Sequence, residues 1–108
     1  MDLPPVITTY LTAHNARDVD SAITAYAPDA VVVDDGRTYH GPEEIRAWLA
    51  GAASQYTYTT ELISATQLDQ EHYDVLQHLE GDFPGGVVDL HHRFTLRGTT
   101  IARLVIEP

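Results

Sequence analysis

The second half of the chain constrains the fold most, because it consists of four β-prone segments joined by short turns. The segments span residues 56–68, 72–80, 87–97 and 100–106. The connections between them are rich in Gly, Asp and Pro, and connections this short favour antiparallel neighbours. We therefore predict an antiparallel sheet in this half of the chain.

Residues 87–97 alternate strictly between an apolar face and a polar face. The apolar face carries Val88, Leu90, His92, Phe94 and Leu96. Side chains of a strand alternate between the two faces of a sheet, so one face of this segment is predicted to be buried. His92 is the single polar residue on that face. By analogy, the inward face of the preceding segment carries Tyr73, Val75, Gln77 and Leu79.

The first half of the chain predicts three short helices. Pro4 and Pro5 suit the first turn of a helix, and apolar residues follow at helical spacing, with Tyr10 and His14 one turn apart. Asp18 is a suitable cap for a second helix, which we expect to run to Tyr26 and to end at Pro28. The third helix is expected over residues 42–49, with Pro42 in its first turn and Ile45, Trp48 and Leu49 as its buried stripe.

A strand and a hairpin are expected between the second and third helices. Residues 30–34 form an apolar run that ends in an acid, and Asp35-Gly36 is a strong signal for a tight turn that returns the chain through residues 37–39. Helices first and long strands afterwards indicate an α+β fold, with the helices on one face of a curved sheet. A chain of 108 residues is long enough for one domain, which we place over residues 1–108.

Composition excludes several classes of function. The formal net charge of −10 repels phosphate backbones, so nucleic-acid binding is not expected. Neither cysteine nor lysine occurs, which removes disulfides, thiolate nucleophiles and lysine Schiff bases. Phosphate-binding loops and dinucleotide fingerprints are also missing from the sequence, and we predict no cofactor. No stretch approaches the about 20 apolar residues of a membrane span, so we expect no membrane association and a cytoplasmic location.

Six histidines raise the question of a metal site. His91 and His92 are adjacent on a strand and therefore point to opposite faces, so they cannot ligate one ion without distortion. We predict no metal site. A simpler interpretation places the polar side chains on the outer face of the sheet or in a subunit interface: His72, His78, Asp89, His91 and Arg93.

Asp34 is the leading candidate for a functional residue. It ends an apolar β-branched run, which the core can hold while the carboxylate stays near water at the mouth of a pocket. The alternative is an acid that only caps the following turn. Aromatic residues that could line the same pocket are Tyr26, Tyr39, Trp48, Tyr56 and Tyr58. Tyr10 and His14 are either members of this pocket or ordinary packing residues.

Three stretches resemble the NTF2-like superfamily, and in particular its SnoaL-like polyketide cyclase group, with ketosteroid isomerase as a more distant relative. They are YLTAHNARDVDSAITAYAPDAVVVDD (residues 10–35), GPEEIRAWL (41–49) and HHRFTLRGTTIARLVI (91–106). The resemblance implies a cone-shaped fold, in which three N-terminal helices and a curved antiparallel sheet enclose a pocket. It also implies a homodimer formed through the outer face of the sheet.

The resemblance to ketosteroid isomerase implies roles for individual residues. Tyr10 matches the tyrosine that binds the oxyanion, and Asp34 matches the general base. Leu90 stands at the position of the protonated acid that completes the oxyanion site, and His92 on the same face is the candidate substitute. Asp34, Tyr10 and His92 are therefore the predicted catalytic residues. The predicted ligand contacts are His14, Tyr26, Tyr39, Trp48, Tyr58, Gln77, Leu90 and Phe94.

Three hypotheses about function follow. The first is a cofactor-independent enzyme in which Asp34 moves a proton from the carbon of a small apolar carbonyl compound, while Tyr10 and His92 steady the enolate. The second is a pocket of the same shape that binds such a ligand without chemistry. The third is a dimeric interaction domain that uses the sheet face. An enzyme requires a titratable group inside a cavity, whereas a binding module needs only apolar walls.

Overall fold

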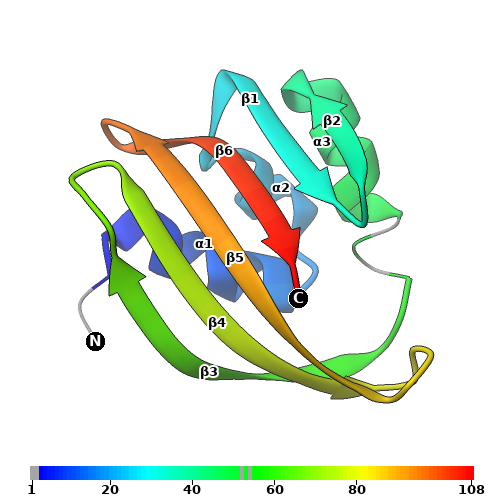
Figure 1. Cartoon of the computed structure of the whole chain (residues 1–108). Coiled ribbons are helices and arrows are strands. Elements are labelled where there is room, and N and C mark those ends of the chain that lie inside the picture. The colour runs from blue at the N-terminus through cyan, green and yellow to red at the C-terminus, as the bar shows by residue number, and fades with distance from the viewer. Residues whose placement is uncertain (1–2, 52, 54) are drawn as a thin grey trace.

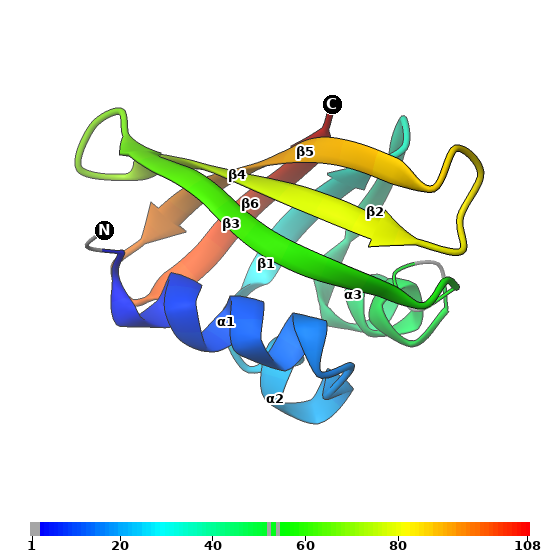
Figure 2. The same cartoon turned by 90° about the horizontal axis from the view of Figure 1, so that it is seen from below.

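The computed structural model describes residues 3–51, 53 and 55–108. The helices in this part of the chain are α1 (Pro5–Asn15), α2 (Val19–Ile23) and α3 (Gly41–Ala50). The strands are β1 (Tyr26–Asp34), β2 (Arg37–His40), β3 (Tyr58–Gln67), β4 (His72–Gly81), β5 (Val87–Arg97) and β6 (Thr100–Glu107). Figures 1 and 2 show the helices on one face of a single curved sheet, which confirms the predicted α+β architecture.

The sheet is mixed, and the prediction of a wholly antiparallel sheet was wrong for one pair of strands. Its order is β2-β1-β6-β5-β4-β3. The consecutive strands β3 to β6 pair antiparallel, as their short connections require, whereas β1 lies parallel to β6. The parallel pair joins segments separated by α3 and four strands. No local connection sets its direction, so turn chemistry could not reveal it.

The prediction that the second helix continues to Tyr26 was also wrong. Helix α2 ends at Ile23, and Tyr26 is already the first residue of β1, where it pairs with Ile101 of β6. Pro28 lies inside this strand instead of ending a helix. The register of β1 against β6 shifts between Tyr26 and Val31, and Pro28 lies in this irregular stretch. Its lack of a backbone N–H therefore removes no hydrogen bond between the two strands.

The core fills the space between the helices and the inner face of the sheet, the face toward α1, α2 and α3. Its fully buried members include Ile7, Tyr10, Ile45, Val32, Phe94, Ile101 and Leu104. The alternation of β5 is confirmed, because His92, Phe94 and Leu96 are buried while Arg93 is exposed. Among the described residues, the buried polar side chains are those of His92 and Gln77, which are diagonal neighbours on β5 and β4.

The β1–β2 hairpin has the predicted two-residue turn. Asp35 and Gly36 have φ values of 53° and 73°, the left-handed conformation that a type I′ turn requires at both positions. Asp34 and Arg37 pair directly across the turn. The hairpin therefore holds the Asp34 backbone in a ladder while its side chain stays at the end of the strand.

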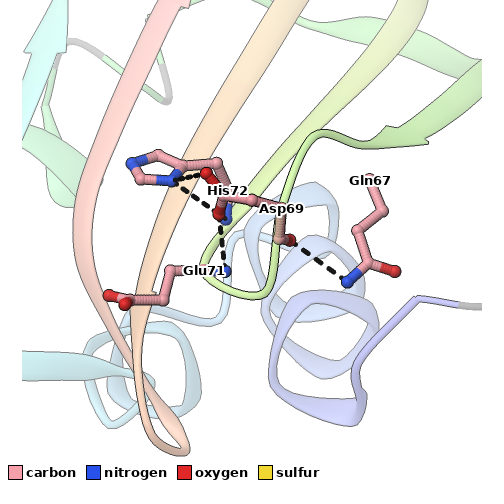
Figure 3. Close-up of polar contacts among 4 residues, drawn as sticks. All are labelled: Gln67, Asp69, Glu71 and His72. Atoms are coloured by element: carbon pink, nitrogen blue, oxygen red, sulfur yellow. Dashed lines mark hydrogen bonds and ion pairs between the residues drawn. The ribbon is translucent and has the colours of Figure 1, made fainter.

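The β3–β4 turn is organised by one carboxylate, as Figure 3 shows. Asp69 Oδ1 accepts hydrogen bonds from the backbone N–H groups of Glu71 (2.8 Å) and His72 (2.9 Å), and it also contacts His72 Nδ1 at 2.8 Å. These donors, led by the Glu71 N–H, lower the pKa of Asp69. This turn stabilises the end of the sheet that lies away from the cavity described below.

Candidate functional site

A cavity of about 440 Å³ lies between α1, α3 and the inner face of the sheet. It falls within the range of about 300–1,000 Å³ that small-molecule sites occupy. Seven of the predicted site residues line it: His14, Asp34, Tyr39, Trp48, Tyr58, Leu90 and His92. They come from α1, the β1–β2 hairpin, α3 and the strands β3 and β5, so only the folded chain brings them together.

Asp34 is partly withdrawn from water and is oriented by Trp48. The indole Nε1–H of Trp48 donates to Asp34 Oδ2 at 3.0 Å, and this carboxylate makes no other hydrogen bond among the described residues, so Oδ1 remains available. Burial raises the pKa of Asp34, while the Trp48 hydrogen bond opposes the rise and the nearby Asp35 adds to it. A carboxylate of raised pKa at the wall of a cavity is suited to accept a proton.

Two histidines on the cavity wall are uncharged at neutral pH. Burial lowers the pKa of His14 to about 4 and that of His92 to about 3, with smaller effects of Arg17 on His14 and of His14 on His92. Their ring centroids are 6.5 Å apart, and the rings are perpendicular. The site thus combines one acidic group with two neutral imidazoles, each of which can donate or accept one hydrogen bond per nitrogen.

Tyr10 and Tyr26 do not line the cavity, contrary to the prediction. Both side chains are buried in the layer behind it. Tyr10 Oη lies 2.6 Å from Tyr26 Oη and 3.0 Å from His14 Nδ1. Burial raises the pKa of both phenols, so both remain protonated. The helical spacing correctly placed Tyr10 and His14 on one face of α1, but His14 occupies the space between Tyr10 and the cavity.

Gln77 and Phe94 were predicted to contact a ligand and instead stand behind the wall. The Gln77 amide nitrogen lies 3.5 Å from His92 Nδ1, so Gln77 supports His92. Phe94 packs edge-on against Tyr10, with ring centroids 6.0 Å apart. Both residues point to the predicted inner face and are buried there, Phe94 under α1 and Gln77 beside His92. The alternation of a strand identifies which side chains lie on the inner face. It does not show which part of that face lines a cavity.

Several cavity residues were not predicted as ligand contacts. Phe83 lies in the β4–β5 connection, which reads only as a turn in the sequence, yet its ring packs near those of Tyr56 and Tyr58. Arg37 brings a cation to the cavity from the hairpin. A lone aromatic residue in a Gly- and Pro-rich loop is the only sequence signal that could have pointed to Phe83.

The outer face of the sheet, which points away from the helices, carries paired charges. Asp74 Oδ1 lies 2.9 Å from His91 Nδ1, and Arg93 Nε lies 3.0 Å from Glu107 Oε1. His91 and His92 lie on opposite faces, as predicted. In residues 3–51, 53 and 55–108, no group of three or more His, Asp or Glu side chains is arranged to hold a metal ion. Nor does any helix of this part have the length and apolarity of a membrane span.

The fold and the cavity define a member of the NTF2-like class, an α+β cone with a pocket on its inner face. The SnoaL-like domain model matches residues 7–104, and this chain belongs to that family. A candidate polyketide cyclase from Sinorhizobium meliloti is 36% identical, with a TM-score of 0.91 over 99% of this chain and 97% of the other. No curated protein sequence matches this chain significantly.

More distant solved structures share the fold. A hypothetical protein of ketosteroid isomerase-like fold from Catenulispora acidiphila, in complex with trimethylamine, is 20% identical. Its TM-score is 0.85 over 99% of this chain and 87% of that one. RV0760c from Mycobacterium tuberculosis, in complex with estradiol-17β-hemisuccinate, is 14% identical with a TM-score of 0.78 over 95% and 90% of the two chains. At these identities the likeness concerns the fold alone.

Proposed function

We propose that this protein binds a small, largely apolar carbonyl compound and removes a proton from the carbon beside the carbonyl, with Asp34 as the base and no cofactor. The observation that carries the proposal is a carboxylate of raised pKa on the cavity wall, with one oxygen held by Trp48 and the other available. A base in this position takes the proton while a neutral donor on another wall shares the charge that develops on the carbonyl oxygen.

The walls support a ligand of this type. Aromatic and aliphatic side chains supply most of the surface: Tyr39, Tyr56, Tyr58, Leu79, Phe83, Val88 and Leu90. His92 is the neutral polar group that we assigned to the enolate from the sequence, and it lines the cavity. Tyr10 no longer fits a direct role, because its hydroxyl is buried behind His14. The bound steroid ester of the Mycobacterium tuberculosis structure and the candidate cyclase support a small apolar ligand.

The proposal is tested with 2-tetralone, an apolar ketone with acidic protons on the carbon beside its carbonyl. In D₂O the protein should speed the exchange of these protons above the buffer background, measured by ¹H NMR. A boiled sample and an equal concentration of acetate serve as controls for unspecific base. Binding of the ketone without faster exchange would contradict the enzyme and favour the second candidate, a binding module with the same aromatic walls.

We further propose that two copies associate through the outer face of the sheet. In the described part of the chain no helix covers this face, and its charged pairs alternate with half-buried apolar side chains such as Leu76 and Val105. A mixed surface of this kind is suited to a self-complementary interface.

Sedimentation velocity at about 50 µM should therefore show a dimer, a concentration chosen to detect weak association. Arg93→Glu reverses a charge in the Arg93–Glu107 pair and should shift the distribution toward monomer. Arg46→Glu makes the same change on α3, where Arg46 is half-exposed beside Asp20, and should leave the association unchanged. A wild-type monomer at this concentration would count against the interface.

A further inference from the structure

We propose that His14 presents a second hydrogen-bond donor to the ligand carbonyl, in addition to His92, and that Tyr26 and Tyr10 set the tautomer of His14 from behind. This inference rests on the proposed function, since it assigns the second half of the same site. His14 would contact the ligand directly. Tyr10 and Tyr26 are positioning residues that act through it.

The tautomer follows from counting protons in a buried chain of three groups. Tyr26 Oη, Tyr10 Oη and His14 Nδ1 are linked by contacts of 2.6 Å and 3.0 Å. The two phenols carry two protons, and neither phenol has a further hydrogen-bond partner among the described residues. Both protons find an acceptor only if Tyr26 donates to Tyr10 and Tyr10 donates to His14 Nδ1.

The opposite direction would leave a buried donor without an acceptor. If His14 Nδ1–H donated to Tyr10, only one hydrogen bond would remain for the two phenol protons, and either the Tyr10 or the Tyr26 proton would have no acceptor in the described structure. A buried donor without an acceptor is strongly disfavoured, and this fixes the direction of the hydrogen-bonded chain. His14 Nδ1 is therefore the acceptor, and the proton of this neutral ring sits on Nε2.

The Nε2–H of His14 is available to a ligand. Among the described residues no buried side-chain nitrogen or oxygen lacks a hydrogen-bond partner. His14 Nε2 has no partner there, so it reaches open space, and the ring lines the cavity beside Trp48 and His92 at centroid distances of 5.7 Å and 6.5 Å. Tyr10, in contrast, uses its only proton on His14. The hydrogen-bond donor that the resemblance assigned to Tyr10 is therefore supplied by His14, one helical turn further along α1.

Trp48 brings the donor and the base to the same part of the cavity. Its indole N–H holds Asp34, and its ring packs against His14. A carbonyl oxygen and its α-carbon are separated by two bonds, so a base and a donor must act within a few ångströms of each other. The neutrality of the ring, which follows from its lowered pKa, means that His14 stabilises the developing enolate as a dipole and not as a cation.

The tautomer can be measured without any ligand. Long-range ¹H–¹⁵N NMR of histidine-labelled protein at neutral pH distinguishes a protonated from an unprotonated ring nitrogen, and His14→Gln assigns the signal. We expect His14 protonated at Nε2 in the wild type and in Tyr26→Phe, where Tyr10 still donates. Tyr10→Phe removes the donor to Nδ1 and should shift the ring toward a mixture of tautomers. Protonation at Nδ1 in the wild type would overturn the inference.

A matched pair of ligands tests the contact itself. 2-Tetralone and tetralin differ by the carbonyl group. The affinity for 2-tetralone divided by the affinity for tetralin therefore reports the hydrogen bond to this carbonyl. His14→Leu should lower this ratio about two- to tenfold, the range of one neutral hydrogen bond. His14→Gln keeps an amide N–H near the position of Nε2 and should restore part of it. An unchanged ratio in His14→Leu would refute the contact.

These results are independent of the proton transfer. If Asp34→Asn exchanges protons as fast as the wild type, the proposed enzymatic function is refuted. The tautomer of His14 and its effect on the affinity for the ketone are still tested by their own measurements.

Discussion

Asp34→Asn should reduce the exchange of the α-protons of 2-tetralone by about a hundred- to ten-thousand-fold, the usual contribution of a positioned acid or base. Asparagine keeps the size of the side chain and an oxygen that accepts the Trp48 N–H, but it cannot take up a proton. Binding of the ketone should therefore survive while exchange is lost. The measurement is the exchange rate at saturating ketone, with the dissociation constant determined separately by titration.

The pH dependence gives the same prediction a second readout. The base works only as a carboxylate, so the exchange rate should rise as pH increases through the pKa of Asp34 and then level off. Burial raises this pKa above the ordinary value for an aspartate, so the rise should lie at higher pH than it would for an exposed aspartate. Asp34→Asn should lose the sigmoidal rise.

Asp35→Asn is the matched control, because it makes the same change one residue further along the hairpin. Asp35 raises the pKa of Asp34 through its charge, so this variant should move the pH profile slightly to lower pH and change the plateau only a few-fold at most. If Asp34→Asn retains the wild-type rate, or if Asp35→Asn causes the larger loss, Asp34 is not the base.

Phe94→Ala should lower the free energy of unfolding by about 3–5 kcal/mol, a large part of the about 5–15 kcal/mol that stabilises a typical domain. The Phe94 side chain is 1% exposed and packs between the sheet and α1, where it contacts the Tyr10 ring. Its removal leaves a cavity in a core that cannot fully close around it. Urea or thermal unfolding followed by circular dichroism measures the loss.

Phe83→Ala is the control of the same residue type, and these are the two phenylalanines of the chain. Phe83 is half-buried at the cavity, where its ring lies near Tyr56 and Tyr58. We expect a small change in stability and a clearly weaker affinity for 2-tetralone. Equal losses of stability in the two variants would contradict this division between a packing residue and a ligand contact.

The sequence alone determined the elements that local chemistry controls. Strict alternation identified the inner face of β5 and placed His92 on it, and Asp35-Gly36 specified the turn that holds Asp34 at the end of β1. The resemblance carried by three motifs agreed with the SnoaL-like family match over residues 7–104. Each of these signals involves residues close in the chain, where side-chain periodicity and turn conformation have a direct physical cause.

Local signals failed where two competing structures share a pattern. Tyr26 fits the apolar spacing of α2 as well as the start of β1, and its pairing with Ile101 decides for the strand. That pairing joins residues separated by most of the chain. The parallel alignment of β1 with β6 likewise depends on how α3 and the long strands return the chain, which no short connection encodes.

Only the tertiary structure decided which inward residues meet the cavity. Tyr10, His14, Phe94 and His92 all point inward, but α1 lies over part of the sheet. His14 and His92 reach the cavity wall, whereas Tyr10 on α1 packs against Phe94 and both are buried. Periodicity gives a side chain its direction, whereas its depth depends on the helix packed against it. The hydrogen-bonded chain from Tyr26 to His14 arises from the same packing, since β1 brings Tyr26 against α1.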